Sequence, residues 1–203
     1  MNPIENYGEL MWKIRSRFDV IEALRQSDSD PFSRAESAAF HGRKIVEAIA
    51  FACLVAVDNG LKIIPRDAKG QWNAEAIFKN LKSKNITALP SPSNIRQATL
   101  EEQMTDGANV TIEGIPEKRL TTEELIEIYK RLHAWLHELN PYSYQGHSEF
   151  YTQKSGTLWA DLEKLHLFIE RHFISIRGAA FFCVLRDTQD RKTKVIPLTK
   201  QEA

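Results

Sequence analysis

The sequence predicts a mainly α-helical protein, a bundle of about five helices that ends in a small C-terminal β-hairpin. Three observations predict this fold. Apolar residues recur every three or four positions over most of the chain, capping boxes stand where two of these periodic segments begin, and the period shortens near the C-terminus. The 203 residues suit a single domain, which we divide into a helical bundle (1–175) and a hairpin (176–203).

The first two helices are predicted from periodicity and capping. An apolar stripe over residues 6–27 recurs at three- or four-residue spacing: Leu10, Ile14, Phe18, Ile21 and Leu24. A capping box of Ser33 and Glu36 begins the second helix, which we expect to end near Asp58. Its second half, residues 48–57, is apolar on every side, so we expect this helix to be the buried centre of the fold.

The middle of the chain carries weaker signals. A short extended piece is predicted at 61–65 and a third helix at 73–83. The segment 84–118 is interrupted by prolines and glycines, so we expect it to be irregular, with one strand at 109–115. A long irregular segment inside a compact domain is typical of a functional or mobile loop.

Two further helices and the hairpin are predicted in the C-terminal half. Thr121 and Glu124 form a second capping box, and Asn140-Pro141 ends the helix that follows. The loop 141–154 is rich in polar and aromatic residues, which either form a binding surface or fold onto the bundle. The remaining elements, a fifth helix and the two hairpin strands, are predicted at 157–173, 179–185 and 193–198.

The composition argues against several classes of protein. Lys plus Arg and Asp plus Glu number 27 each, and the net charge of zero is unlike that of a general polyanion-binding protein. Cys53 and Cys183 stand in apolar runs without partners at zinc spacing, which predicts two buried thiols in a reducing compartment. The longest apolar run, residues 48–57, is too short to span a bilayer, and the charged N-terminus is unlike a signal peptide. We expect a cytoplasmic protein that does not enter a membrane.

Two Arg–His pairs are the candidate catalytic residues, Arg34 with His41 and Arg131 with His137. Histidine can act as a general acid–base, and arginine can stabilise the charge that develops on a phosphate. On a helix, Arg34 and His41 project within about 20° of each other, which favours this pair. Arg131 and His137 project about 120° apart, although they directly precede the polar loop. Chance alone accounts for a similar number of such spacings.

Two short runs resemble a known superfamily. Residues 40–49 are similar to the Arg-Lys-x-x-Glu helix of HEPN-like and abortive-infection-type proteins, and residues 136–142 are similar to their Leu-His-x-x-Asn-Pro helix end. The resemblance extends loosely over the first 175 residues. It implies a helical bundle, association in pairs and, in the members that cleave RNA, an Arg-x4–6-His site across a two-fold interface. The residue after this arginine is usually polar in active members, whereas here it is Ala35 or Leu132.

These observations support two hypotheses of different classes. The first is a non-catalytic HEPN-like interaction or regulatory protein of prokaryotic defence, which binds a protein partner or a second copy of itself. The alternative is a metal-independent HEPN-type ribonuclease that acts on RNA through Arg34 and His41, or Arg131 and His137, at a dimer interface. A weaker alternative is a metal-dependent hydrolase, because His133 and His137 lie four apart on one helix. We predict no metal and no cofactor.

Overall fold

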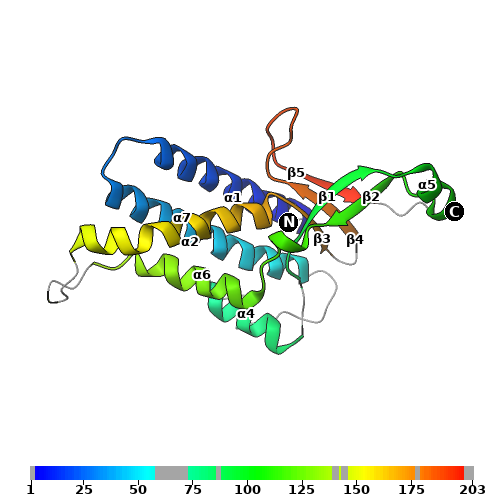
Figure 1. The fold of residues 1–203 in the computed structure, drawn as a ribbon. Helices are drawn as coiled ribbons and strands as arrows, with labels where there is room; N and C mark the ends of the chain where they lie inside the picture. Colours follow the sequence, from blue (N-terminus) through cyan, green and yellow to red (C-terminus); the bar gives the residue numbers. More distant parts are fainter. Residues whose placement is uncertain are drawn as a thin grey trace.

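The computed structural model consists of a body of helices with a five-stranded antiparallel sheet at one end (Figure 1). It describes residues 3–57, 73–85, 88–138, 142, 146–176 and 179–198. The helices of the body are α1 (Pro3–Gln26), α2 (Pro31–Val57), α4 (Ala74–Ser83), α6 (Thr122–Ala134) and α7 (His147–Ile169). The strands follow the order β2-β1-β3-β4-β5, with β1 (Ser91–Gln97), β2 (Val110–Gly114), β3 (Arg171–Ile176), β4 (Ala179–Val184) and β5 (Lys194–Leu198). The prediction of a mainly α fold with a smaller β part is confirmed.

Helix α2 is the centre of the body, as its apolar second half predicts. It packs against α1, α4, α6 and α7, and most of its residues from Ile45 onward are buried. Gly42 allows the close approach of α6 and α7, since a Cβ atom there would lie 2.4 Å from Leu162 Cδ2 and 3.2 Å from Leu132 Cδ1. The helix thus carries the main hydrophobic core of the described chain.

The start of α2 differs from the prediction of a capping box at Ser33. The helix begins two residues earlier, at Pro31, a position where the missing N–H of proline costs nothing. Asp30 accepts hydrogen bonds from the Ser33 backbone N–H at 2.8 Å and from Ser33 Oγ at 3.0 Å. The carboxylate of Asp30 therefore caps the first turn, and Ser33 lies inside the helix.

Helices α6 and α7 confirm one predicted boundary and revise three others. The Thr121–Glu124 capping box is present, with both reciprocal hydrogen bonds. Helix α6 ends at Ala134, before the predicted stop at residue 140. Helix α7 begins at His147, so part of the predicted loop 141–154 is helical, and the helix ends at Ile169 because the chain turns directly into β3.

The predicted C-terminal hairpin is only part of a larger sheet. Strands β4 and β5 pair antiparallel as predicted, but β3 pairs with β4 along its whole length and β1 pairs with β3. The predicted helix 157–173 overlaps only the first half of β3, and no element is predicted at 174–176. The side chains of β3 nevertheless alternate between exposed and buried: Arg171 and Ser175 are exposed, and His172 and Ile174 are buried. This alternation is the period of a strand.

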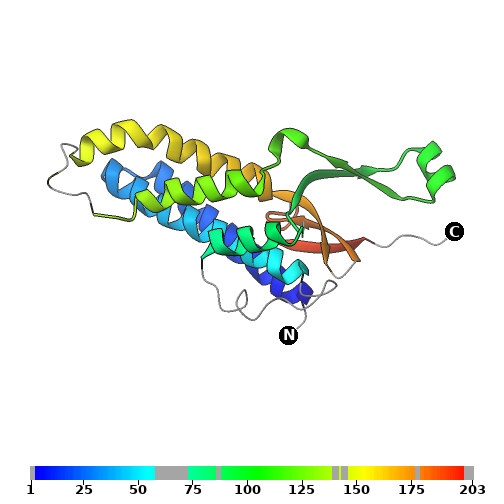
Figure 2. The ribbon, with the colours of Figure 1, turned by 90° about the horizontal axis from the view of Figure 1, so that it is seen from below.

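The predicted irregular segment 84–118 contains regular structure. Strands β1 and β2 form a long antiparallel ribbon, the helix α5 (Leu100–Asp106) lies at its tip, and a short 3-10 helix, η1 (Pro116–Lys118), leads into α6. Only Ser91 and Pro92 of β1 pair with β3, and the rest of the ribbon extends away from the body (Figure 2). We call the extended part, residues 94–113, the arm.

The remaining predictions concern single elements, the cysteines and membrane spans. The helix predicted at 73–83 and the strand predicted at 109–115 are present as α4 and β2. Cys53 and Cys183 are buried and free, as expected. The extended piece predicted at 61–65 lies outside the described residues. Among the described helices, none combines the length and the apolar character needed to cross a bilayer.

Candidate functional site

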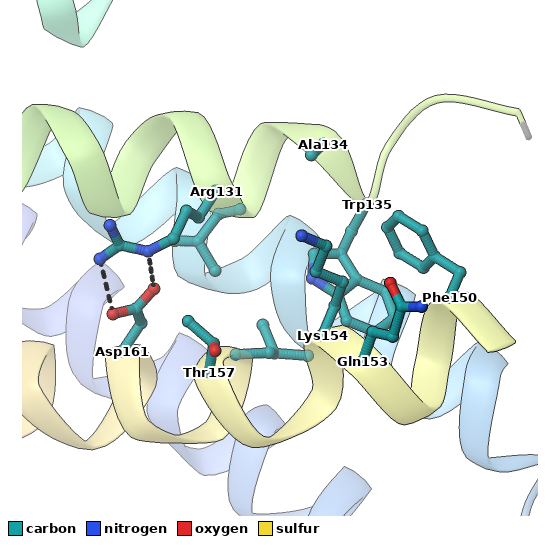
Figure 3. A pocket seen from close by; sticks show the side chains of 10 residues that line it. Arg131, Ala134, Trp135, Phe150, Gln153, Lys154, Thr157 and Asp161 are labelled. Carbon is teal, nitrogen blue, oxygen red and sulfur yellow. Dashed lines mark hydrogen bonds and ion pairs between the residues drawn. The ribbon is translucent and has the colours of Figure 1, made fainter.

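Arg131 and Asp161 link α6 to α7 in the middle of the groove between these helices. Arg131 donates from Nε to Asp161 Oδ2 at 2.7 Å and from Nη2 to Asp161 Oδ1 at 2.8 Å (Figure 3). The Asp161 side chain is 3% exposed, whereas that of Arg131 is 44% exposed. The hydrogen bonds that Arg131 donates to Asp161 raise the pKa of Arg131. The pair has the bidentate geometry of the strongest arginine–carboxylate contacts.

A pocket of about 190 Å³ lies in the groove beside this ion pair. Its walls are apolar and buried: Leu132, Trp135, Phe150 and Leu158. Its rim is polar and exposed, with Gln153, Lys154 and Thr157 on α7 (Figure 3). Apolar walls with a few polar groups at the edge are typical of a site that holds an apolar side chain or a small molecule.

A second, more polar hollow of about 420 Å³ lies on the other side of Arg131, toward η1. Both acidic and basic side chains line it: Glu117, Lys118, Arg119, Glu123, Glu124, Glu127 and Lys164. Because Arg131 lines both hollows, they form one groove along α6 and α7. We call this the α6–α7 groove.

His133 on α6 and His137, just beyond the end of that helix, belong to a separate polar cluster that includes residues of α2. Their Nε2 atoms lie 3.1 Å apart, and the His133 ring stacks parallel to that of Tyr129. Tyr129 Oη accepts hydrogen bonds from Arg43 at 3.2 and 3.3 Å and donates one to Glu47 at 3.4 Å. Arg43 also forms an ion pair with the buried Glu47 at 3.2 Å. The cluster therefore places a cation and two imidazole rings along one edge of α6.

The protonation of this cluster follows from its surroundings. Burial lowers the pKa of His133, and the nearby Arg43 and His137 act in the same direction. His133 Nδ1 is buried without a hydrogen-bond partner, whereas its Nε2 faces His137. A neutral His133 with its proton on Nε2 can therefore donate that proton to His137 Nε2, an arrangement able to relay a proton.

Metal binding by the histidine pair lacks further ligands. No group of three or more His, Cys, Asp or Glu side chains suited to a metal ion occurs within the described part of the chain. His147, the next histidine along the chain, stacks instead on Phe32, with ring centroids 4.5 Å apart. Two imidazoles alone would fill only half of the four coordination positions that zinc takes in proteins.

Neither predicted Arg–His pair forms a direct contact within one chain. Arg34 donates to the carbonyl oxygen of Ser27, at the turn between α1 and α2, and so points away from His41. His41 Nδ1 lies 3.3 Å from Arg17 Nη1 on α1, and burial followed by the charge of Arg17 lowers the pKa of His41.

The second pair separates in the same way. Arg131 bonds Asp161 on the α7 side of α6, and His137 contacts His133 on the α2 side. His137 lies three residues beyond the end of α6, so its direction is set by the turn that follows the helix and not by helical spacing.

Asp161 was missed by reasoning from the sequence, although a signal was present. It occupies a position of the buried stripe of α7, between Leu158 and Leu162. A carboxylate on an apolar stripe implies a cationic partner, because a buried charge is otherwise expensive. Comparisons of the chain with family models, with curated proteins and with solved structures found no match.

Proposed function

We propose that this protein is a non-catalytic, HEPN-like interaction protein that binds a protein segment in the α6–α7 groove. The observation that carries the proposal is the bidentate pair between Arg131 and the buried Asp161. An arginine that turned to a phosphate would leave a buried carboxylate uncompensated, at a cost of about 3 kcal/mol or more. Arg131 is therefore a structural residue, and the apolar pocket beside it is the feature available for binding.

The chemistry of the groove suits a protein better than a nucleic acid. The pocket walls are aromatic and aliphatic, as in the buried centre of protein–protein interfaces. The polar hollow that continues the groove mixes acidic and basic side chains, so it offers a phosphate backbone no uniform positive potential. The zero net charge of the chain agrees with this reading.

Metal-independent RNA cleavage is the second candidate function, favoured by the contact between His133 and His137. His137 is exposed, and a proton can pass between the two rings. Arg131 is engaged within its own chain, so this function requires His137 to meet an arginine across a dimer interface.

RNA cleavage separates the two candidates. We expect purified protein to leave a mixed, labelled RNA pool intact, alongside folded His41→Ala and His137→Ala variants. Cleavage by the unmodified protein that is lost in only one of these variants would assign the protein as a ribonuclease and identify its histidine. Cleavage that all three share would point to a contaminating nuclease, and the repurified protein should then be inactive.

Site-specific cross-linking tests the groove directly. We expect a photo-reactive side chain at position 153, on the rim of the pocket, to cross-link to a protein in cells. The same group at position 13, on α1, is the matched control, since Lys13 is also exposed and no residue of α1 lines the groove. Adding Thr157→Arg should abolish the cross-link by filling the pocket, and a cross-link that survives this change would contradict binding in the groove.

A further inference from the structure

The α5 tip of the arm and the α6–α7 groove have complementary surfaces. We infer that the groove of one copy of this chain holds the arm of a second copy, so that two copies exchange arms. This inference rests on the proposed role of the groove as a protein-binding site, and it names the partner.

The arm presents two large apolar side chains to solvent. Leu100 is 78% exposed and Met104 is 88% exposed. They lie four residues apart on α5, so they project from the same face of the helix. An amphipathic helix that binds a groove uses anchors with this spacing.

The arm holds this helix in a fixed position. Arg96 on β1 donates two hydrogen bonds of 2.8 Å to Glu102 on α5 and one of 2.5 Å to Glu113 on β2. A capping box between Thr99 and Glu102 begins α5, and Gly107, with a positive φ of 63°, ends it. A prearranged helix loses little conformational freedom when it binds.

The arm also lacks support from its own body. Beyond Pro92, β1 pairs with β2 alone among the described strands, and Ile95 and Val110 on this ribbon are partly exposed. An isolated two-stranded ribbon is marginally stable in water unless its apolar residues pack against another surface. A binding partner would supply that surface.

The pocket matches the anchors in size and in chemistry. A cavity of roughly 150 Å³ with aliphatic and aromatic walls can hold a molecule of benzene. The pocket between α6 and α7 is about 190 Å³ and has similar walls, so it can admit a leucine or methionine side chain.

Charges on the two surfaces are also complementary. Residues 94–113 contain one arginine and four acidic residues. Glu101, next to Leu100, is exposed and forms no ion pair within the described chain. Lys154 on the rim of the pocket is likewise exposed and without an ion-pair partner among the described residues. Opposite charges at the edge of an interface fix its register and favour the correct partner.

The geometry requires the arm to come from another copy. The pocket lies at the C-terminal end of α6, whereas the arm joins α6 at its N-terminal end, through η1. The 13 residues of α6 span about 20 Å. The arm extends away from the body (Figure 2), so it does not fold back onto its own groove. A two-fold axis between antiparallel copies would form both arm–groove contacts at once.

Mixed disulfides test this arrangement. Under mild oxidation, a Met104→Cys chain mixed with a Thr157→Cys chain should give a disulfide-linked dimer of the two variants. The native thiols do not interfere, because Cys53 and Cys183 are buried. A Met104→Cys chain mixed with a Lys13→Cys chain is the matched control and should give no such product.

Sedimentation measures the same contact without cross-linking. The unmodified chain should sediment as a dimer, and a Leu100→Glu, Met104→Glu variant should associate at least roughly tenfold more weakly. Its thermal unfolding as a monomer should be unchanged, because both side chains are exposed. Glu101→Lys and Lys154→Glu should each weaken the dimer, and the double variant should restore it.

The outcomes separate this inference from the proposed function. A monomer at all concentrations, or a mixed disulfide no stronger than its control, would overturn arm exchange. If the group at position 153 still cross-links to a different protein, the groove remains a binding site with another occupant. If it cross-links to nothing and the chain is monomeric, both proposals fail.

Discussion

Replacing Arg131 by methionine should destabilise the protein more than replacing its partner Asp161 by leucine. The Asp161 side chain is 3% exposed, and both of its oxygens accept hydrogen bonds from Arg131. Without Arg131 the carboxylate is buried and uncompensated, which costs about 3 kcal/mol of unfolding free energy. Without Asp161 the guanidinium, with 44% of its side chain already exposed, can turn to water, so the loss is about 1 kcal/mol.

Thermal unfolding at neutral pH, followed by calorimetry, measures this difference. For a chain of this size, each kcal/mol changes Tm by about 2–4 °C. We therefore expect Arg131→Met to lower Tm by about 6–12 °C and Asp161→Leu to lower it by about 2–4 °C. The double variant should resemble Asp161→Leu alone, because it removes the buried charge. Equal losses in the two single variants, or a double loss equal to their sum, would refute this account of the pair.

Two further predictions concern the core. His172 is buried, receives a hydrogen bond from Tyr7 and donates one to a backbone carbonyl, and burial lowers its pKa to about 4. The imidazole of the unfolded chain has a pKa of about 6.5. The stability that the neutral His172 ring contributes is therefore fully present above that pH and is lost as the pH falls toward 4. Urea unfolding measures the difference in free energy of unfolding between wild type and His172→Gln. We expect this difference to decrease by about 2.5 kcal/mol from about pH 7.5 to about pH 4.5. A difference that stays constant would contradict the low pKa. Gly42→Ala should lower the free energy of unfolding by about 1–2 kcal/mol, since the new methyl group meets Leu162, whereas Gly156→Ala on exposed α7 should raise it by up to about 1 kcal/mol. Similar increases in Tm for both glycine variants would show that the helix contact at Gly42 is not tight.

Features that depend on neighbours along the chain could be predicted from the sequence. The capping box of Thr121 and Glu124 closes within three residues, and it is present where predicted. The all-apolar stretch 48–57 identified α2 as the buried central helix, because a helix without a polar face must be surrounded. A capping box of the same kind, Thr99 with Glu102, also marked the start of α5, but the prolines and glycines around it favoured an irregular segment.

Features that depend on distant partners required the tertiary structure. Whether Arg131 is free for chemistry is decided by Asp161, thirty residues away on another helix. Strand β3 follows α7 directly, and its assignment depends on pairing with β4 and β1.

The sequence by itself determined the helical class, the central helix and the start of α6, because local periodicity and capping act over a few residues. The tertiary structure alone decided the extent of the sheet, the projecting arm and the groove beside Arg131. The physical reason is that ion pairs, strand pairing and pockets arise between surfaces that only folding brings together.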